Sequence, residues 1–402
     1  MGQDYSTFKT IFDTLTLPYQ KQIDRELARH SKALEFLYKP VESTDGKPVN
    51  GIPTFEGRYV KMAINAEYPV TYSNLNQFNM QHGDVKQPKK AKNLLYAEIS
   101  AVDKAFTMGI YTSDLQQLKT KGADRNKMIY VNWIEDFWKS YMKGFALHMC
   151  NSIYNGAGDT AIDADGNVKP DFIGLNAIGG ILNSTAYGTK SSADFYEWQA
   201  HMWDLGGATT ASRLGFAAAD VDTVAELVVP ASSYKTSRFY NVINRSRQQI
   251  EEISGERIIC IMSPAQYDFL WLPALEANQI NSASRLSING NALEVKDDIS
   301  KLGSLEIYRE NSRLPISESG GGVKYVMDNN YIFFINPSYL NLEVESSNNF
   351  IVSDWQEIPN QYNTLQKSMT STMLFYATKR FNMGKLKLPA AVAAELDTYY
   401  SL

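Results

Sequence analysis

The longest regular pattern in the chain is a stripe of large apolar side chains, four positions apart, between residues 125 and 154. Its members are Ile129, Trp133, Phe137, Tyr141, Phe145, Met149 and Ile153. Side chains with this spacing lie on one face of an α-helix, so the stripe predicts a single amphipathic helix of about eight turns, roughly 45 Å long. We expect its core face to be formed by Trp133, Phe137, Tyr141, Phe145 and Met149. A helix face of this length and aromatic content needs a larger covering surface than one small domain provides.

The residues that precede this helix predict a long two-stranded ribbon. Apolar and polar residues alternate around residues 60–64 and again around 106–110, which is the period of a β-strand. Between these strands lies a polar excursion over residues 68–92. Its lysines are Lys86, Lys89, Lys90 and Lys92. A ribbon of two strands is marginally stable alone in water, so we expect it to lie on a neighbouring chain. The lysines would then contact that neighbour, although simple solubility explains them equally well.

Downstream of the helix, the pattern is that of α/β layers. A helix is predicted over residues 236–253, an apolar strand over 258–262, and a helix over 265–277 that Ser263 and Pro264 open. Shorter strands are predicted at 305–309, 324–328, 331–336, 340–345 and 371–381, and a short helix in the tail after residue 383. Residues 184–235 are small and polar, which is typical of loops and an insertion. Near the N-terminus, residues 6–38 have a helical pattern that Pro18 interrupts.

Catalytic motifs are absent from the sequence, and the candidate metal ligands have the wrong spacing. Asp159, Asp163 and Asp165 suggest a calcium loop, but Ala161 and Phe172 would occupy two of its ligand positions. The four histidines show no metal-ligand spacing, and the two cysteines, Cys150 and Cys260, are expected to be buried thiols. We therefore expect no metal, no cofactor and no catalytic residue. Adjacent carboxylates such as those at 251–252 and 297–298 keep an α/β enzyme as a remote alternative.

Charge and aromatic content narrow the class of partner. The net charge of −5 argues against a general nucleic-acid coat, which needs clustered cations. No apolar run approaches 18 residues, so no membrane span is expected. The 24 tyrosines are as compatible with an assembling surface as with a tyrosine-rich core.

Several passages, taken in order along most of the chain, resemble the major capsid proteins of tailed bacteriophages, which have the Hong Kong 97-type shell fold. The first is the strand-then-Asp-Leu-x-x-Gln passage from Lys104 to Gln117, which precedes the long helix. The others follow the helix: Tyr154 to Gly158, Phe172 to Leu175, Ile259 to Tyr267, and Leu302 to Tyr308 with Ser312 to Pro315. Each motif alone is weak, and the resemblance rests on their order.

The resemblance implies an α+β shell subunit with five parts. These are an N-terminal arm (1–54), an extended E-loop (55–112), a peripheral domain with the long spine helix (113–158), an axial domain (159–335) with an insertion near 184–235, and a return to the peripheral domain with a C-terminal tail (336–402). Such subunits form hexamers and pentamers that close into the icosahedral virion shell around packaged double-stranded DNA, after assembly in the host cytoplasm.

The same resemblance implies the other partners of the shell. The short stretch before the E-loop suggests a separate scaffolding protein, and a portal and a decoration protein are further expected partners. The residues of the lysine–asparagine crosslink found in some members have no match here, so that chemistry is not expected. The nearest alternative is a cellular nanocompartment shell of the encapsulin type, which has the same fold; those chains tend to be shorter and to lack an insertion such as 184–235.

Overall fold

The computed structural model describes a large part of the 402-residue chain. The described residues are 13, 32–37, 39–42, 48–64, 95–111, 125–158, 171–177, 180–183, 187–188, 190, 198–207, 221–228, 237–254, 257–281, 299–302, 305–315, 323–357 and 364–400. The tip lysines, the aspartates at 159–165 and the carboxylates at 297–298 lie outside these ranges.

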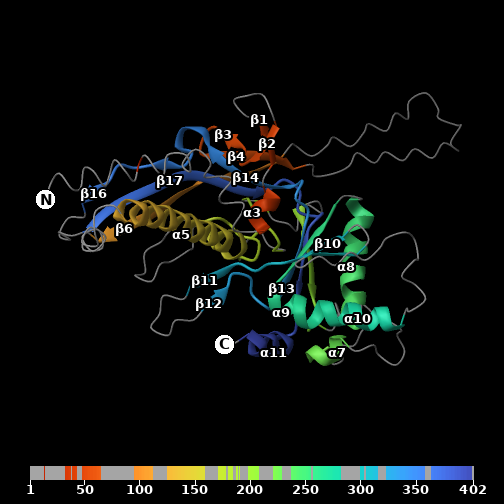
Figure 1. Ribbon diagram of the computed structural model, residues 1–402. Coiled ribbons are helices and arrows are strands. Elements are labelled where there is room, and N and C mark those ends of the chain that lie inside the picture. The colour runs from red at the N-terminus through yellow and green to blue at the C-terminus, as the bar shows by residue number, and fades with distance from the viewer. Residues whose placement is uncertain are drawn as a thin grey trace, which may run out of the picture.

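A long helix against a long sheet forms one half of the molecule (Figure 1). The helix α5 (Arg125–Asn155) has 31 residues and matches the range predicted from the apolar stripe. Beside it, β6 (Val102–Tyr111) and β17 (Thr364–Ala377) pair antiparallel over ten residues. Around them lie β14 (Leu340–Glu345), β3 (Thr54–Phe55), β15 (Ile351–Val352) and β16 (Gln356–Glu357).

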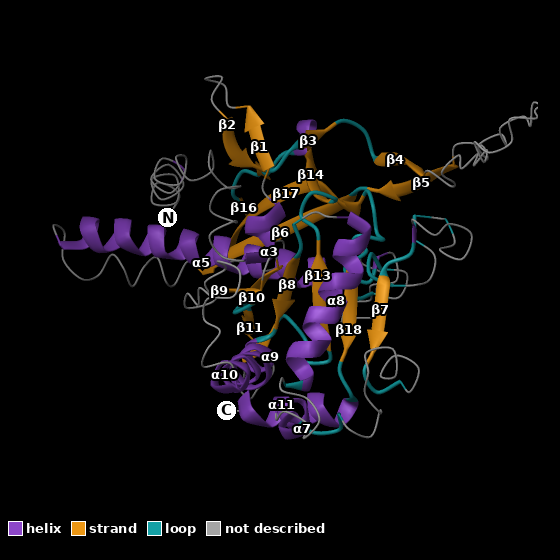
Figure 2. Ribbon diagram, turned by 90° about the vertical axis from the view of Figure 1, so that its right-hand side faces the viewer, coloured by secondary structure: helices purple, strands orange, loops and turns teal. Residues whose placement is uncertain are grey.

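A second sheet forms the other half. Its strand order is β7-β18-β13-β8-β10-β9. The strands are β7 (His201–Asp204), β18 (Gly384–Lys387), β13 (Tyr331–Ile335), β8 (Ile259–Met262), β10 (Leu305–Arg309) and β9 (Ile299–Leu302). Figure 2 shows α8 (Arg238–Ser254) lying in front of these strands, with α7 (Val224–Val228), α10 (Leu272–Asn281) and α11 (Ala390–Tyr400) gathered at one end.

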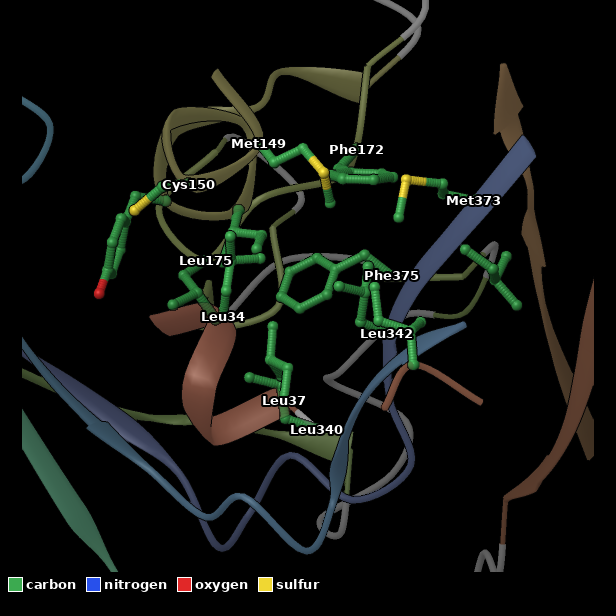
Figure 3. Close-up of a cluster of buried hydrophobic side chains, with 14 of the residues drawn as sticks. Leu34, Leu37, Met149, Cys150, Phe172, Leu175, Leu340, Leu342, Met373 and Phe375 are labelled. Atoms are coloured by element: carbon green, nitrogen blue, oxygen red, sulfur yellow. The ribbon is translucent and has the colours of Figure 1, made fainter. Parts of the chain in front are cut away.

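Two apolar cores result, and the second sheet has one face in each. We call the first the spine core: it joins α5, β6, β14 and β17 with the short helix α3 (Lys32–Leu37). Figure 3 shows part of it, where Leu34, Met149, Leu342 and Phe375 converge. We call the second the sheet core: it joins α8, α10 and α11 to the opposite face of the second sheet. Every residue of β8 is buried, because alternate side chains enter different cores.

The helix α5 ends where the sequence predicts, at two glycines that lie against another loop. Gly158 has a φ of +65°, a left-handed conformation that side chains disfavour. A Cβ on Gly156 would lie 2.4 Å from the carbonyl oxygen of Phe172, so the loop of residues 171–175 can approach only a glycine. This close approach fixes the direction in which the chain leaves the helix.

Ser263 and Pro264 begin a helix as expected, although the helix is not uniform. The Ser263 hydroxyl accepts from the backbone N–H of Gln266, and the Gln266 side chain accepts from that of Ser263, which completes a capping box. After α9 (Pro264–Gln266) the chain widens into a π-helical turn over Tyr267–Trp271 before α10 begins. Pro273 has no N–H to continue the regular α-helical pattern, and a local widening accommodates that loss.

Strand pairing differs from the sequence prediction in the ribbon. The partner of β4 (Tyr59–Ile64) is β5 (Leu95–Ser100), not the strand around 106–110. That second predicted strand is β6, which belongs to the sheet of β17. The prediction was wrong because the alternation of Leu95, Ala97 and Ile99 is short and follows directly on an Asn- and Lys-rich stretch, which made the whole region read as one polar excursion.

Three further strands differ from the elements expected from the sequence. Residues 201–204, expected within an insertion, form β7 and pair with β18 inside the second sheet. The last strand begins at Thr364 instead of 371, because its first half carries polar residues on its exposed face. Residues 384–387 also belong to the second sheet, so the stretch after 336 contributes to both halves of the molecule.

Two further hairpins complete the described strands. They pair β1 (Lys39–Glu42) with β2 (Pro48–Gly51), and β11 (Arg313–Pro315) with β12 (Val323–Tyr325).

Candidate functional site

The described residues have no candidate metal site. They contain no group of three or more histidine, cysteine or acidic side chains that could hold a metal ion. Both cysteines are free and buried, and burial raises the pKa of the Cys260 thiol well above its usual value, so this thiol is unreactive. No helix within the described ranges is long and apolar enough to cross a membrane. The most specific polar contacts of the described residues lie at joints between segments.

The core-facing residues named from the sequence line up along α5. Tyr141, Phe145 and Met149 are buried, and Trp133 and Phe137 are partly buried against the same core. The Tyr141 hydroxyl donates to the backbone carbonyl of Phe106 on β6, and the two rings lie 4.8 Å apart. Burial raises the pKa of Tyr141, so this hydroxyl keeps its proton at neutral pH. The helix is thus joined to β6 by aromatic packing and by a hydrogen bond.

The described base of the ribbon has one covered face and one open face. Met62, Ala97 and Ile99 are buried in the spine core, and the backbone N–H of Glu98 donates to the carbonyl of Gly188. On the other face Tyr59 is half exposed, with Lys61 over its ring at 5.1 Å. The base therefore packs on its own chain, whereas the excursion beyond residue 64 lies outside the described residues. Figure 2 shows β4 and β5 directed away from the body.

A charged joint connects β6 to the end of α5. The Lys104 ammonium pairs with the Asp171 carboxylate and donates to the Ser152 hydroxyl at 3.2 Å. It also lies 4.6 Å from the centre of the Phe172 ring. Nearby, burial lowers the pKa of the His148 imidazole, and the positive charge of Lys104 lowers it further. A single lysine thus connects the strand, the helix and the loop that follows it.

A buried carboxylate connects the end of α5 to the second sheet. Glu310 is 1% exposed and follows β10 directly. It accepts from the Tyr154 hydroxyl at 3.0 Å and from the Ser312 hydroxyl at 2.5 Å. The Tyr154 ring stacks on Phe333 of β13, with centroids 5.7 Å apart. Because Tyr154 lies on α5 and Glu310 beside β10, this contact holds the two halves together.

Arg380 is a fully buried cation that organises a distant segment. Its guanidinium donates to the backbone carbonyls of Gly180, Ile181, Asn183 and Trp198. The rings of Tyr187 and Trp198 flank it at 4.9 and 5.9 Å. Burial lowers its pKa to about 10, which still leaves it charged at neutral pH. Arg380 therefore supplies donors to carbonyls of a loop, and that of Gly180 also accepts a backbone hydrogen bond, from the N–H of Asn183.

Reasoning from the sequence missed these charged joints. Lys104, Glu310 and Arg380 are separated from their partners by 67, 156 and up to 200 residues, so no local spacing reveals them. The only available signal is a single charged residue inside an apolar strand pattern, as at Lys104. The four tip lysines and the calcium-like aspartates lie outside the described residues, and their roles stay predictions.

Comparison with known proteins identifies the fold. No protein-family model matches the chain, and no curated protein matches it in sequence. Among solved structures, a chain of the cyanophage A-1(L) capsid asymmetric unit matches with a TM-score of 0.52 at 9% identity, covering 89% of this chain and 92% of that one. Matches with lower scores include the capsid of the native GTA particle (0.42, 11% identity, 84% and 88% covered) and the mature capsid of bacteriophage PhiM1 (0.41, 12% identity, 83% of each covered).

The cyanophage comparison defines the class of fold to which this chain belongs. Agreement over nine-tenths of both chains at 9% identity is a likeness of backbone arrangement. The chain has the mixed α+β fold of a tailed-phage major capsid subunit, and the Hong Kong 97-type architecture expected from the sequence is confirmed.

Proposed function

We propose that this chain is the major capsid protein of a tailed, double-stranded DNA bacteriophage and a component of the virion. The observation that carries the proposal is the shared fold over nearly the whole length of this chain and of the cyanophage capsid chain. The charged joints and two continuous cores support a structural role.

We propose that the chain is divided into the parts of such a shell subunit. We assign residues 1–54 to an arm, 55–112 to the E-loop, 113–158 to the peripheral domain, 159–335 to the axial domain, and 336–402 to the returning segment. The second sheet crosses the last of these boundaries, because β18 pairs with β13. Closed symmetry repeats each contact many times, so individual contacts between copies need only be modest.

The partners follow from the same proposal. Copies of the chain would form hexamers and pentamers, with a scaffolding protein and a portal during assembly, decoration proteins outside, and DNA held without sequence preference inside. The tip lysines Lys86, Lys89, Lys90 and Lys92 would contact acidic surface on a neighbouring copy and steer association.

Electron microscopy of the purified protein tests this function. The wild-type chain is produced alone and together with the proposed scaffolding protein, and each sample is imaged. A matched variant replaces residues 68–92 with a short Gly-Ser link. We expect the wild type to form closed shells, and the variant to unfold at the same temperature while failing to close. Wild-type protein that stays monomeric at every concentration in both samples contradicts the proposal, and shells filled with a protein cargo point instead to a nanocompartment.

A further inference from the structure

A lysine is buried in the spine core on the face of β17 that packs against α5. Lys367 pairs in register with Met108 of β6, and its immediate same-face neighbours on β17 are Leu365 and Met369. The side chain of Lys367 is 5% exposed. Transfer of an ammonium from water into such surroundings is costly unless an opposite charge meets it. The position of Lys367 therefore requires an acidic partner.

An aromatic side chain lies beside the Lys367 ammonium. Trp355, which directly precedes β16, is 8% exposed, and its ring centre lies 5.6 Å from the ammonium. An indole face stabilises a cation but leaves its charge uncancelled. The lysine and the tryptophan together form a cationic site on β17, with an aromatic wall.

The acidic partner comes from the far end of the chain. The Asp13 carboxylate accepts a hydrogen bond from the Lys367 ammonium, and the two residues are 354 positions apart in the sequence. The Asp13 side chain is 45% exposed, so one end of the ion pair is in contact with solvent. The ion pair can therefore separate by movement of Asp13, whereas Lys367 is fixed on the central strand β17.

We propose that Lys367 and Trp355 form a receptor on β17 for an acidic side chain, and that Asp13 occupies it as a latch that holds the N-terminal segment on the body. The receptor belongs to the rigid sheet, and its occupant belongs to the chain terminus. Release of the latch takes this carboxylate away from a buried ammonium, so the docked state is favoured. The inference stands on the contacts of the single chain and does not depend on shell formation.

The Lys104 joint shows that this arrangement recurs on the same strand pair. Lys104 lies opposite Ser371 on the same face of β6 and β17, and its carboxylate partner, Asp171, also comes from a segment outside the sheet. The two pairs differ in exposure: Lys104 and Asp171 are both about one-fifth exposed, whereas Lys367 is buried and Asp13 is open. This asymmetry is what makes the Asp13 contact releasable.

Limited proteolysis and hydrogen–deuterium exchange of the unassembled full-length chain test the latch. The variants are Asp13→Asn, Lys367→Met and the double substitution. Asp24→Asn is the control for loss of one negative charge in the same terminal region. Lys379→Met is the control for loss of an exposed lysine that also lies over a ring, that of Tyr339 at 4.7 Å.

We expect Asp13→Asn to speed exchange and cleavage within residues 1–31 by about tenfold, and added salt to do the same to the wild type in part. Lys367→Met releases the segment equally, and the double variant is no worse than either single one, because both act on one contact. The two controls leave the N-terminal rates unchanged. Unchanged N-terminal rates in Asp13→Asn, or equal acceleration in Asp24→Asn, overturn the proposal. If Lys367→Met fails to fold, the comparison of Asp13→Asn with Asp24→Asn still tests whether the Asp13 carboxylate holds the N-terminal segment.

Discussion

The spine core and the sheet core are both well buried, but they differ in how charge is used. Four charged side chains among the described residues are nine-tenths or more buried: Glu310, Lys367, Arg380 and Lys385. Each contacts residues in or packed against the spine core. In the sheet core the buried polar groups are neutral, such as Ser246 and the capping pair Ser263 and Gln266.

The difference reflects how each core is assembled from the sequence. Most of the sheet core comes from residues 221–281 and the strands that follow, and its interior is built from apolar side chains with a few neutral polar groups. The spine core gathers segments from both termini and from the loop after α5, and buried charges fix where those segments dock. Apolar contact is non-directional, whereas a buried charge accepts only one arrangement of partners. The spine core is therefore expected to respond to loss of a charge, and the sheet core to loss of volume.

The largest effect is expected at Arg380. Arg380→Met removes the guanidinium donor from the carbonyls of residues 181, 183 and 198, and leaves that of Gly180 with only the Asn183 backbone N–H. Each buried unsatisfied group is costly. The free energy of unfolding should fall by about 4 kcal/mol in a urea titration. Lys379→Met, which removes an exposed cation one residue away, is the matched control and should change it little. A similar loss in both variants contradicts a special role for the buried charge.

A smaller loss is expected from an apolar deletion in the sheet core. Leu386 is fully buried there, so Leu386→Ala creates a cavity that lowers the free energy of unfolding by about 3 kcal/mol. Met202→Ala, at a 43% exposed position of the neighbouring strand, is the control. The Leu386→Ala loss should be the same at low and high salt. A marked salt dependence would show that charge matters in this core as well.

The joint between the halves gives the third comparison. Tyr154→Phe removes one donor from the buried Glu310 carboxylate while preserving the ring stack on Phe333. Unfolding should become easier by about 2 kcal/mol. Tyr399→Phe is the control, because the hydroxyl that it removes donates to Glu395 at an exposed position. Its change in the free energy of unfolding should be within the error of denaturant titration. Equal effects of the two substitutions would remove Glu310 as a specific joint.

The smallest effect is expected at Lys104. Its ion pair with Asp171 is partly exposed to water, so Lys104→Met should cost within about 1 kcal/mol. Thermal unfolding in a salt series checks this value. A loss as large as that of Arg380→Met would mean that exposure does not separate the strong joints from the weak ones.

Strongly periodic elements could be predicted from the sequence, and elements defined by distant partners could not. The range of α5, the Ser263 cap and the strands β10 and β14 are confirmed, since each has a local signal in spacing or capping. The strand β5 was missed because its ribbon partner defines it, and β7 because its apolar residues are few.

The charged joints were beyond reach for a related reason. A lone lysine or arginine in the sequence has the same appearance whether it is solvated or buried. Lys367 and Arg380 become distinctive only when the fold brings Asp13 and the loop of residues 180–183 to them. The fold class, in contrast, could be inferred, because the order of its weak motifs extends along most of the chain.

Cryo-electron microscopy of particles assembled from the purified chain tests the central claim most directly. The account predicts an icosahedral shell of hexamers and pentamers. Each subunit in the density map would have the fold described above, with the excursion between β4 and β5 lying on an adjacent copy. A chain that remains a single, self-contained subunit at every concentration, with residues 65–94 folded on its own body, would contradict it.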